Sequence, residues 1–245
     1  MSILSFSSRE YSESISILES LKEKYSIFAI PKPSSNIYFA NERVPLENPD
    51  IWERYDKELL KNTYWQSNTL LLYKRAAKYF PLIEPILKKN NLPDDFKYLS
   101  LIESGLENVT SPAGAKGFWQ IMKSTAKEFN LEVNSEVDER YHIEKSTQAA
   151  CDFLNSAKEK FGTWTLAAAA YNMGRSGLLK QINRQKSYTY YDLLLNNETS
   201  RYIFRILAIK EIIEHPKKYG FQFREEDFSS NYQLRQHQYS KQVQR

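Results

Sequence analysis

The stretch that decides the fold runs from Pro93 to Gly105 and reads PDDFKYLSLIESG. Asp94 or Asp95 begins a helix in this stretch. Gly105 ends the helix, because a residue without a Cβ adopts the left-handed termination at little cost. The stretch therefore predicts one short helix with a defined start and end.

One face of this helix carries a carboxylate among apolar groups. Phe96, Leu99 and Glu103 fall at positions i, i+3 and i+7, so Glu103 shares a face with side chains that seek the core. Partial burial raises the pKa of a carboxyl group, and the C-terminus of a helix is a poor place for an anion. Both effects suit a general acid. The alternative from this spacing alone is a Glu103 side chain turned outward at a frayed helix end.

Similar signals predict helices along most of the chain, since Gly is scarce, at 7 residues, while Leu, Ile, Ala, Lys and Glu are plentiful. The predicted helices are 7–25, one capped by Asn48 and ending near Lys61, 68–80, 81–89, 123–129, 145–161, and one capped by Asn197 and ended by Pro216. Residues 163–171 are apolar nearly all round and are expected to be buried. The fold class is therefore mainly α, in a chain of 245 residues whose 41% hydrophobic side chains allow a sizeable core.

The composition argues against several classes of function. The single Cys151 excludes an intrachain disulfide and fits a small residue packed within a helix. His142, His215 and His237 are scattered, without the spacing of metal ligands or of a nucleophile and its base. The net charge of +4 comes from Lys and Arg interspersed with acids, so the chain lacks the basic stripe of a nucleic-acid-binding module. We expect no metal site and no nucleic-acid partner.

Two further segments follow the helix. Residues 102–105 are followed by 111–120, which read SPAGAKGFWQ, and by 170–174, which read AYNMG. In this order they resemble the motifs of the lytic transglycosylase family, within the goose-type lysozyme superfamily. Shorter matches are 137–140, 146–147 with 149–150, 161–164 and 198–202. The resemblance runs from about Pro93 to Ile213, half of the chain.

The resemblance implies a lysozyme-like helical domain with a substrate cleft and an N-terminal helical extension. It also implies cleavage of the β-1,4 bond between N-acetylmuramic acid and N-acetylglucosamine in peptidoglycan, without water. Glu103 would protonate the glycosidic oxygen as catalytic acid. The ionised Glu103 would then accept the proton of the muramyl C6 hydroxyl, which closes a 1,6-anhydro ring. One carboxylate and no cofactor serve this chemistry, whereas most glycosidases use two carboxylates.

The resemblance assigns substrate contacts to the loop after this helix. Ser104 would orient the acid or the N-acetyl group, or else bind carbonyls at the helix end. Gly117 would let the loop backbone approach the sugar, although a tight turn also explains it. Trp119 offers a flat apolar face and Gln120 an amide for the polar rim of a sugar, while Trp119 fits a core position equally well.

Four more substrate-binding residues come from the later motifs. Tyr171 and Asn172 end a packed run, and the resemblance implies that Asn172 binds the N-acetyl group of the muramyl sugar. The alternative for Asn172 is a helix-termination residue. Glu198 would face the cleft, although a negative charge in the first turn of a helix also stabilises that helix. Tyr202 lies one turn later and points the same way.

These assignments divide the chain into four parts. Residues 1–45 form a leader helix and connector, 46–92 a helical N-terminal extension, 93–215 the lytic transglycosylase catalytic domain and 216–245 a polar C-terminal tail. The end of the leader rests on a cluster of helix breakers, Pro31, Pro33, Ser34 and Ser35.

The substrate implies a location in the periplasm or at the outer membrane. The expected partner is the glycan strands of peptidoglycan, and this location allows peripheral association with the outer membrane. Met1 to Arg9 lack the features of a secretory signal, and no apolar segment is long enough to span a membrane. The motifs identify no protein partner. Two alternatives stay open. One is a hydrolytic muramidase, which needs a positioned water and a second acid such as Asp138 or Glu198, and the other is a catalytically silent peptidoglycan-binding module.

Overall fold

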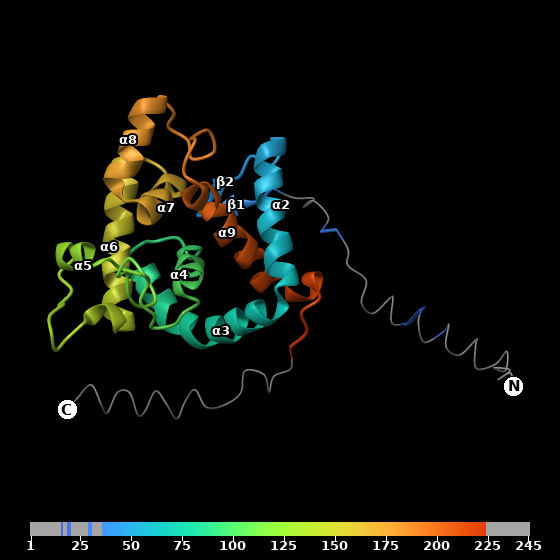
Figure 1. The fold of residues 1–245 in the computed structure, drawn as a ribbon, viewed down its shortest axis with the longest axis horizontal. Coiled ribbons are helices and arrows are strands. Elements are labelled where there is room, and N and C mark those ends of the chain that lie inside the picture. The colour runs from blue at the N-terminus through green and yellow to red at the C-terminus, as the bar shows by residue number, and fades with distance from the viewer. Residues whose placement is uncertain (1–15, 17–18, 21–28, 31–35, 224–245) are drawn as a thin grey trace, which may run out of the picture. The chain divides into compact units, whose positions relative to one another are not determined.

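The structure is a computed structural model that describes residues 16, 19–20, 29–30 and 36–223. Most of the predicted helix 7–25 and all of the polar segment 233–245 lie outside the described residues. From residue 36 on, the described chain is mainly helical, with eight α-helices and one two-stranded hairpin (Figure 1). This confirms the predicted mainly α fold class.

Helix α4 (Phe96–Ser104), which carries Glu103, packs between helices from earlier and later parts of the chain. In chain order the elements are β1 (Tyr38–Phe39), β2 (Glu42–Arg43), α2 (Pro49–Tyr64), α3 (Gln66–Lys89), α4 (Phe96–Ser104), α5 (Lys123–Glu128), η1 (Glu139–Tyr141), α6 (Ile143–Phe161), α7 (Trp164–Met173), α8 (Arg175–Gln185), α9 (Asn197–Glu214) and η2 (Pro216–Tyr219). α2 packs along α9, α6 packs against α7 and α3, and α4 lies against α3 and α9 (Figure 1). The helix that carries Glu103 is therefore held by elements from both halves of the described chain.

Polar and glycine caps set the ends of these helices. Asn48 caps α2 through its side-chain oxygen, as predicted. Gly105 ends α4 in the left-handed conformation, with a φ of 63°, which confirms the predicted boundary. The predicted cap of α9 is wrong by one residue. Asn196 rather than Asn197 is the cap, because its Oδ1 accepts from the backbone N–H of Thr199 at 2.8 Å.

α3 corrects the prediction of two helices over 68–80 and 81–89. It is one helix of 24 residues that contains Pro81 and Pro85, and Figure 1 shows that it bends along its course. A proline inside a helix costs about 3 kcal/mol, because it lacks an N–H and its ring crowds the preceding turn. A buried stripe along the whole helix offsets this cost. The stripe consists of Thr69, Leu72, Ala76, Phe80, Ile83 and Leu87.

The sequence prediction has no counterpart for α8 or for the β1–β2 hairpin. α8 buries only Leu178 and Ile182, so its apolar stripe is too narrow to stand out from its polar sequence. The β1–β2 hairpin lies in the predicted connector, and its Phe39 is fully buried. Glu42 of β2 accepts from the backbone N–H of Thr165 at 2.9 Å and so caps the first turn of α7. The hairpin is therefore part of the core.

The beginning of the predicted C-terminal tail also packs on the helices. Tyr219 and Phe221 are buried, and the Tyr219 hydroxyl donates to Glu211 at 2.9 Å. The ring of Phe223 stacks on Tyr73, with the ring centroids 3.9 Å apart. The predicted boundary at residue 216 is too early, because apolar side chains continue to pack as far as the described chain extends. The other domain boundaries stay predictions.

Removal of residues 1–33 is expected to leave the helical body folded. The chain divides into two units after Pro31, and this deletion keeps the hairpin in the second unit. Circular dichroism should show an unchanged melting temperature. The matched control removes the chain through Pro45, which takes away the buried Phe39 and the Glu42 cap and should lower the melting temperature strongly. Loss of cooperative melting in the shorter deletion would show that the leader belongs to the core.

Candidate active site

Glu103 lies in the last turn of α4, two residues before Gly105. Burial is the main cause that raises the pKa of its carboxyl from 4.5 to about 7. A hydrogen bond from Tyr202 and the charge of Arg205 act in the opposite direction, while the charge of Glu198 adds to the increase. A carboxyl with this pKa is protonated in a large fraction of molecules at neutral pH and can also release its proton. These properties fit a residue that acts first as acid and then as base.

Tyr202 of α9 lies directly against this carboxyl. Its hydroxyl donates to Glu103 Oε1, and the residue is only 1% exposed. Burial and the charge of Glu103 raise the pKa of Tyr202 well above its usual range, so the hydroxyl keeps its proton. This corrects the predicted substrate contact, because a buried Tyr202 can hold the acid in place but cannot reach a sugar.

Trp119 belongs to the core, which corrects its predicted role as a face for the sugar. The residue is fully buried, and its indole N–H donates to Thr147 Oγ1 at 2.8 Å. The backbone carbonyl of Trp119 accepts from the Tyr171 hydroxyl at 2.6 Å. Burial and the nearby charge of Glu103 raise the pKa of Tyr171. Trp119 therefore supports the surroundings of the acid through Tyr171.

The loop between α4 and α5 holds other predicted residues. Ser104 Oγ donates to the carbonyl of Phe118 at 2.8 Å, which favours the interpretation of Ser104 as a carbonyl-binding residue at the helix end. Gln120 Nε2 donates to the carbonyls of Gly117 at 2.8 Å and Val109 at 3.1 Å. These bonds fasten the loop to itself and to the end of α4, beside the acid.

Gly117 is required by the packing of the same loop. Its φ is 75°, and a Cβ at this position would lie 2.0 Å from the carbonyl oxygen of Arg140. No side chain fits in that space. The close approach that explains this glycine is therefore to the Arg140 backbone, and a bound sugar is not needed to explain it.

Asn172 and Glu198 meet where α7 ends and α9 begins. Asn172 Nδ2 donates to Glu198 Oε1 at 2.8 Å, and Asn172 Oδ1 accepts from the Thr199 hydroxyl at 2.7 Å. Glu198 lies in the first turn of α9, as predicted, and is exposed. Because the charge of Glu198 affects the pKa of Glu103, these residues belong to the same site.

Sequence reasoning missed two residues of this site, Thr199 and Arg205. Thr199 stands next to Glu198 inside the motif 198–202, so that motif could have indicated it. Arg205 follows Tyr202 by about one helical turn, and its guanidinium donates to the carbonyl of Ile102 at 3.1 Å. This bond ties α9 to the end of α4.

Comparison with known proteins agrees with this geometry. Residues 80–194 match the family model described as Transglycosylase SLT domain. A relative in Escherichia coli K12, named membrane-bound lytic murein transglycosylase D, is 34% identical over 180 residues, and the alignment covers 71% of this chain and 39% of the relative. Residues 80–194 therefore form a transglycosylase SLT domain. The protein of the same name in Escherichia coli O6:H1 matches with the same identity and coverage, so the chain spans about two fifths of the length of these curated relatives.

The SLT match covers the site residues on α4 and α7 but not those on α9. It begins within α3, includes Glu103 and Asn172, and ends before Glu198 and Tyr202. The side chains that α9 contributes to the SLT site are therefore placed by the structure and by the later sequence motif rather than by the family model.

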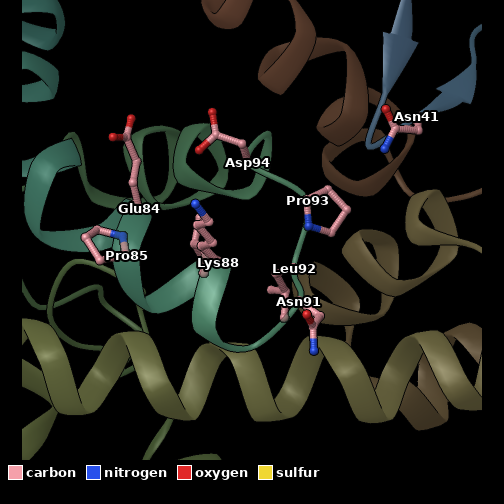
Figure 2. A pocket seen from close by; sticks show the side chains of 9 residues that line it. Asn41, Glu84, Pro85, Lys88, Asn91, Leu92, Pro93 and Asp94 are labelled. Atoms are coloured by element: carbon pink, nitrogen blue, oxygen red, sulfur yellow. The ribbon is translucent and has the colours of Figure 1, made fainter.

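A pocket with a volume of about 810 Å³ is lined by none of the predicted site residues. Figure 2 shows it where the end of α3 and the loop to α4 face the turn that carries Asn41. Its two carboxylates, Glu84 and Asp94, both accept hydrogen bonds from Lys97 Nζ, at 2.8 Å for Glu84. Neither is an unpaired acid, so this pocket offers no candidate for a general acid.

Cysteine and metal chemistry find no support in the described part of the chain. Cys151 is buried, and burial raises the pKa of its thiol to about 12, which fits the predicted packing residue. Among the described residues, no group of three His, Cys, Asp or Glu side chains is placed to hold a metal ion. In the same part of the chain, no helix has the length and apolar character needed to cross a membrane.

Proposed function

We propose that this chain is a peptidoglycan lytic transglycosylase. It cleaves the β-1,4 bond between N-acetylmuramic acid and N-acetylglucosamine without water and leaves 1,6-anhydromuramyl ends. The observation that carries the proposal is Glu103, which lies within the SLT match, has a pKa of about 7 and accepts a hydrogen bond from Tyr202. The names of the Escherichia coli relatives, lytic murein transglycosylases, support the same activity.

The proposed reaction uses Glu103 twice. In the first step, protonated Glu103 donates its proton to the glycosidic oxygen, and the bond between that oxygen and muramyl C1 breaks while the muramyl N-acetyl oxygen assists at C1. In the second step, ionised Glu103 accepts the proton of the C6 hydroxyl while O6 bonds to C1 and displaces the N-acetyl oxygen from it. N-acetylglucosamine leaves as an alcohol, and Glu103 is protonated again. The hydrogen bond from Tyr202 stabilises the ionised form between the two steps.

The hydrolytic alternative needs a second acid, and Asp138 is a poor one. Its carboxylate binds the Arg140 guanidinium at 2.7 and 2.8 Å and pairs with Lys116 at 3.2 Å. These contacts, with the Arg140 hydrogen bonds first, lower the pKa of Asp138 to about 2. Glu198 already accepts from the amide of Asn172. This arrangement favours the lytic mechanism, in which Glu103 acts as both acid and base, over the hydrolytic mechanism, which needs two carboxyl groups.

The sugar contacts fall to side chains that are not fully buried. Asn172 donates its amide N–H to the N-acetyl carbonyl of the muramyl sugar, and the other proposed contacts, which are all at least partly exposed, are Glu198, Gln120, Tyr171 and Ser104. The reaction requires no metal or other cofactor. Because murein is the substrate, the protein acts in the cell envelope, in the periplasm or in peripheral association with the outer membrane. The membrane-bound names of the relatives support the envelope location.

Mass spectrometry of the soluble products from purified murein sacculi tests this function. The expected products carry 1,6-anhydromuramyl ends and are lighter by one water than hydrolytic products. A digest by a hydrolytic muramidase supplies the reference masses. Products with reducing ends alone would make the protein a muramidase, and a wild-type protein that binds sacculi without releasing products would be a silent binding module.

Asn172→Ala should slow turnover more than it lowers stability. Loss of one substrate hydrogen bond costs about 1–3 kcal/mol, which corresponds to about 5- to 150-fold in kcat/KM. The release of murein fragments measures the rate, and thermal melting measures stability. Asn197→Ala, at an exposed position in the first turn of α9, is the control and should change neither. A large fall in melting temperature with an unchanged rate would return Asn172 to a structural role.

A further inference from the structure

A chain of hydrogen bonds holds the side chain of Asn172. The Thr199 hydroxyl donates to Asn172 Oδ1 at 2.7 Å, and Asn172 Nδ2 donates to Glu198 Oε1 at 2.8 Å. Thr199 and Glu198 are neighbours in the first turn of α9, while Asn172 lies near the end of α7. Both ends of the amide therefore have a partner on the facing helix.

Thr199 is itself held in place. Its backbone N–H donates to Asn196 Oδ1 at 2.8 Å, and its carbonyl accepts from the Tyr190 hydroxyl at 2.7 Å. Both Thr199 and Tyr190 are almost completely buried. The Thr199 hydroxyl therefore approaches Asn172 from the protein interior and from a backbone that is bonded on both sides.

These contacts decide which way the Asn172 amide faces. A carboxylate only accepts hydrogen bonds, so Nδ2 must face Glu198, and a reversed amide would place Oδ1 against the carboxylate. The Thr199 hydroxyl favours the same orientation, because it donates to Oδ1. Within the described part of the chain, Nδ2 bonds only to Glu198. The second hydrogen on Nδ2 is therefore a donor that a substrate can use.

We propose that Thr199 is a positioning residue that fixes Asn172 as a hydrogen-bond donor toward a carbonyl oxygen of the substrate. This inference rests on the proposed function, because the muramyl sugar supplies such an oxygen in its acetamido group. With the hydroxyl present, the amide is oriented before the substrate binds. Without it, only the hydrogen bond to Glu198 remains, and the amide can turn about that single bond so that its second N–H no longer points toward the carbonyl.

The test compares two variants at this position. Thr199→Val keeps the shape of the side chain and removes the hydroxyl, whereas Thr199→Ser keeps the hydroxyl. On murein sacculi, Thr199→Val should lower kcat/KM by about tenfold, and Thr199→Ser should stay within about twofold of the wild type. In an Asn172→Ala background, Thr199→Val should cause no further loss, because Thr199 acts through Asn172. Ser200→Ala is the control, since its hydroxyl bonds to Asn197 O within the same helix.

A second measurement requires no substrate. In the nuclear magnetic resonance spectrum, the side-chain amide signals of Asn172 should shift in Thr199→Val and remain close to the wild type in Thr199→Ser. The melting temperature of each variant shows whether the helices stay packed around the substitution. If Thr199→Val does not fold, Thr199→Ala removes the same hydroxyl without placing a methyl group in its position.

The outcomes separate the two proposals. If the wild type is active and Thr199→Val leaves kcat/KM unchanged, the positioning role is overturned and the proposed function stands. The same holds if Thr199→Val lowers kcat/KM equally in the wild type and in the Asn172→Ala background. Unchanged Asn172 amide signals would also overturn it. A wild-type protein that releases no fragments from sacculi would overturn the proposed function and this inference together.

Discussion

Glu103→Gln is expected to remove nearly all release of glycan fragments while the protein stays folded. Glutamine keeps the volume and the hydrogen-bonding shape of the side chain, but it carries no proton that can pass to the leaving oxygen. General acid catalysis supplies about 10²- to 10⁴-fold in rate. Because Glu103 also acts as the base, the loss should reach the upper part of that range. The rate of soluble fragment release from sacculi measures it.

Glu107→Gln is the matched control for this substitution. Glu107 follows α4, is exposed and forms an ion pair with Arg75 at the surface. Its replacement removes a carboxyl close to the same helix end and should leave the rate within about twofold, because exposed ion pairs contribute little. Undiminished lysis by folded Glu103→Gln would remove Glu103 from the chemistry.

The pH dependence of stability gives a second measurement on Glu103→Gln. The pKa of Glu103 is about 7 in the folded protein and near 4.5 in an unfolded chain, so the folded state binds the proton more tightly. Below a pH of about 4.5, the carboxyl is neutral in both states and contributes its full stability. As the pH rises from about 4.5 through 7, the wild type loses this stability, whereas the glutamine variant does not. Denaturant unfolding at about pH 4 and about pH 8 should show the difference growing with pH, and a constant difference would contradict the buried acid.

Local sequence was sufficient to predict α4 and the face on which Glu103 lies. The spacing of Phe96, Leu99 and Glu103 and the termination at Gly105 depend on residues within two or three helical turns. Asn48 was predicted as a cap for the same reason, since a cap acts on the next few backbone amides. The order of the later motifs then indicated Asn172 and Glu198, which the structure joins by a hydrogen bond.

The errors at the site have a common physical cause. Trp119 and Tyr202 lie on the expected segments, but their burial depends on residues far away in the chain. Trp119 donates to Thr147, 28 residues later, and Tyr202 donates to Glu103, 99 residues earlier. The period of a helix predicts which face a side chain occupies, but it cannot predict what covers that face.

The continuous α3 has a related explanation. The predicted helices 68–80 and 81–89 meet at Pro81, whose effect on a helix is local, whereas the buried stripe that outweighs this effect depends on helices that pack from elsewhere in the chain. Gly117 is similar, because the Arg140 carbonyl that excludes a Cβ lies 23 positions along the sequence and is close only in the folded protein.

Tyr202→Phe is expected to lower kcat/KM by about 10- to 150-fold, because a hydrogen bond to a charged group contributes about 1.5–3 kcal/mol. The same substitution should move the pH dependence of the reaction. Activity requires protonated Glu103 and falls as the pH rises through its pKa. The hydrogen bond from Tyr202 lowers that pKa, so removing the hydroxyl raises it further. The alkaline limit of activity should therefore shift to higher pH while the maximum rate decreases.

Profiles of kcat/KM against pH for Tyr202→Phe and Tyr191→Phe separate this effect from a loss of packing. The Tyr191 hydroxyl is also buried, but it has no hydrogen-bond partner among the described residues, so its removal should change neither the rate nor the profile. A slower Tyr202→Phe enzyme with an unmoved alkaline limit would mean that Tyr202 supports the shape of the site rather than the charge of Glu103. A shift to lower pH would contradict the hydrogen bond itself, because only a donor to the carboxylate stabilises its ionised form.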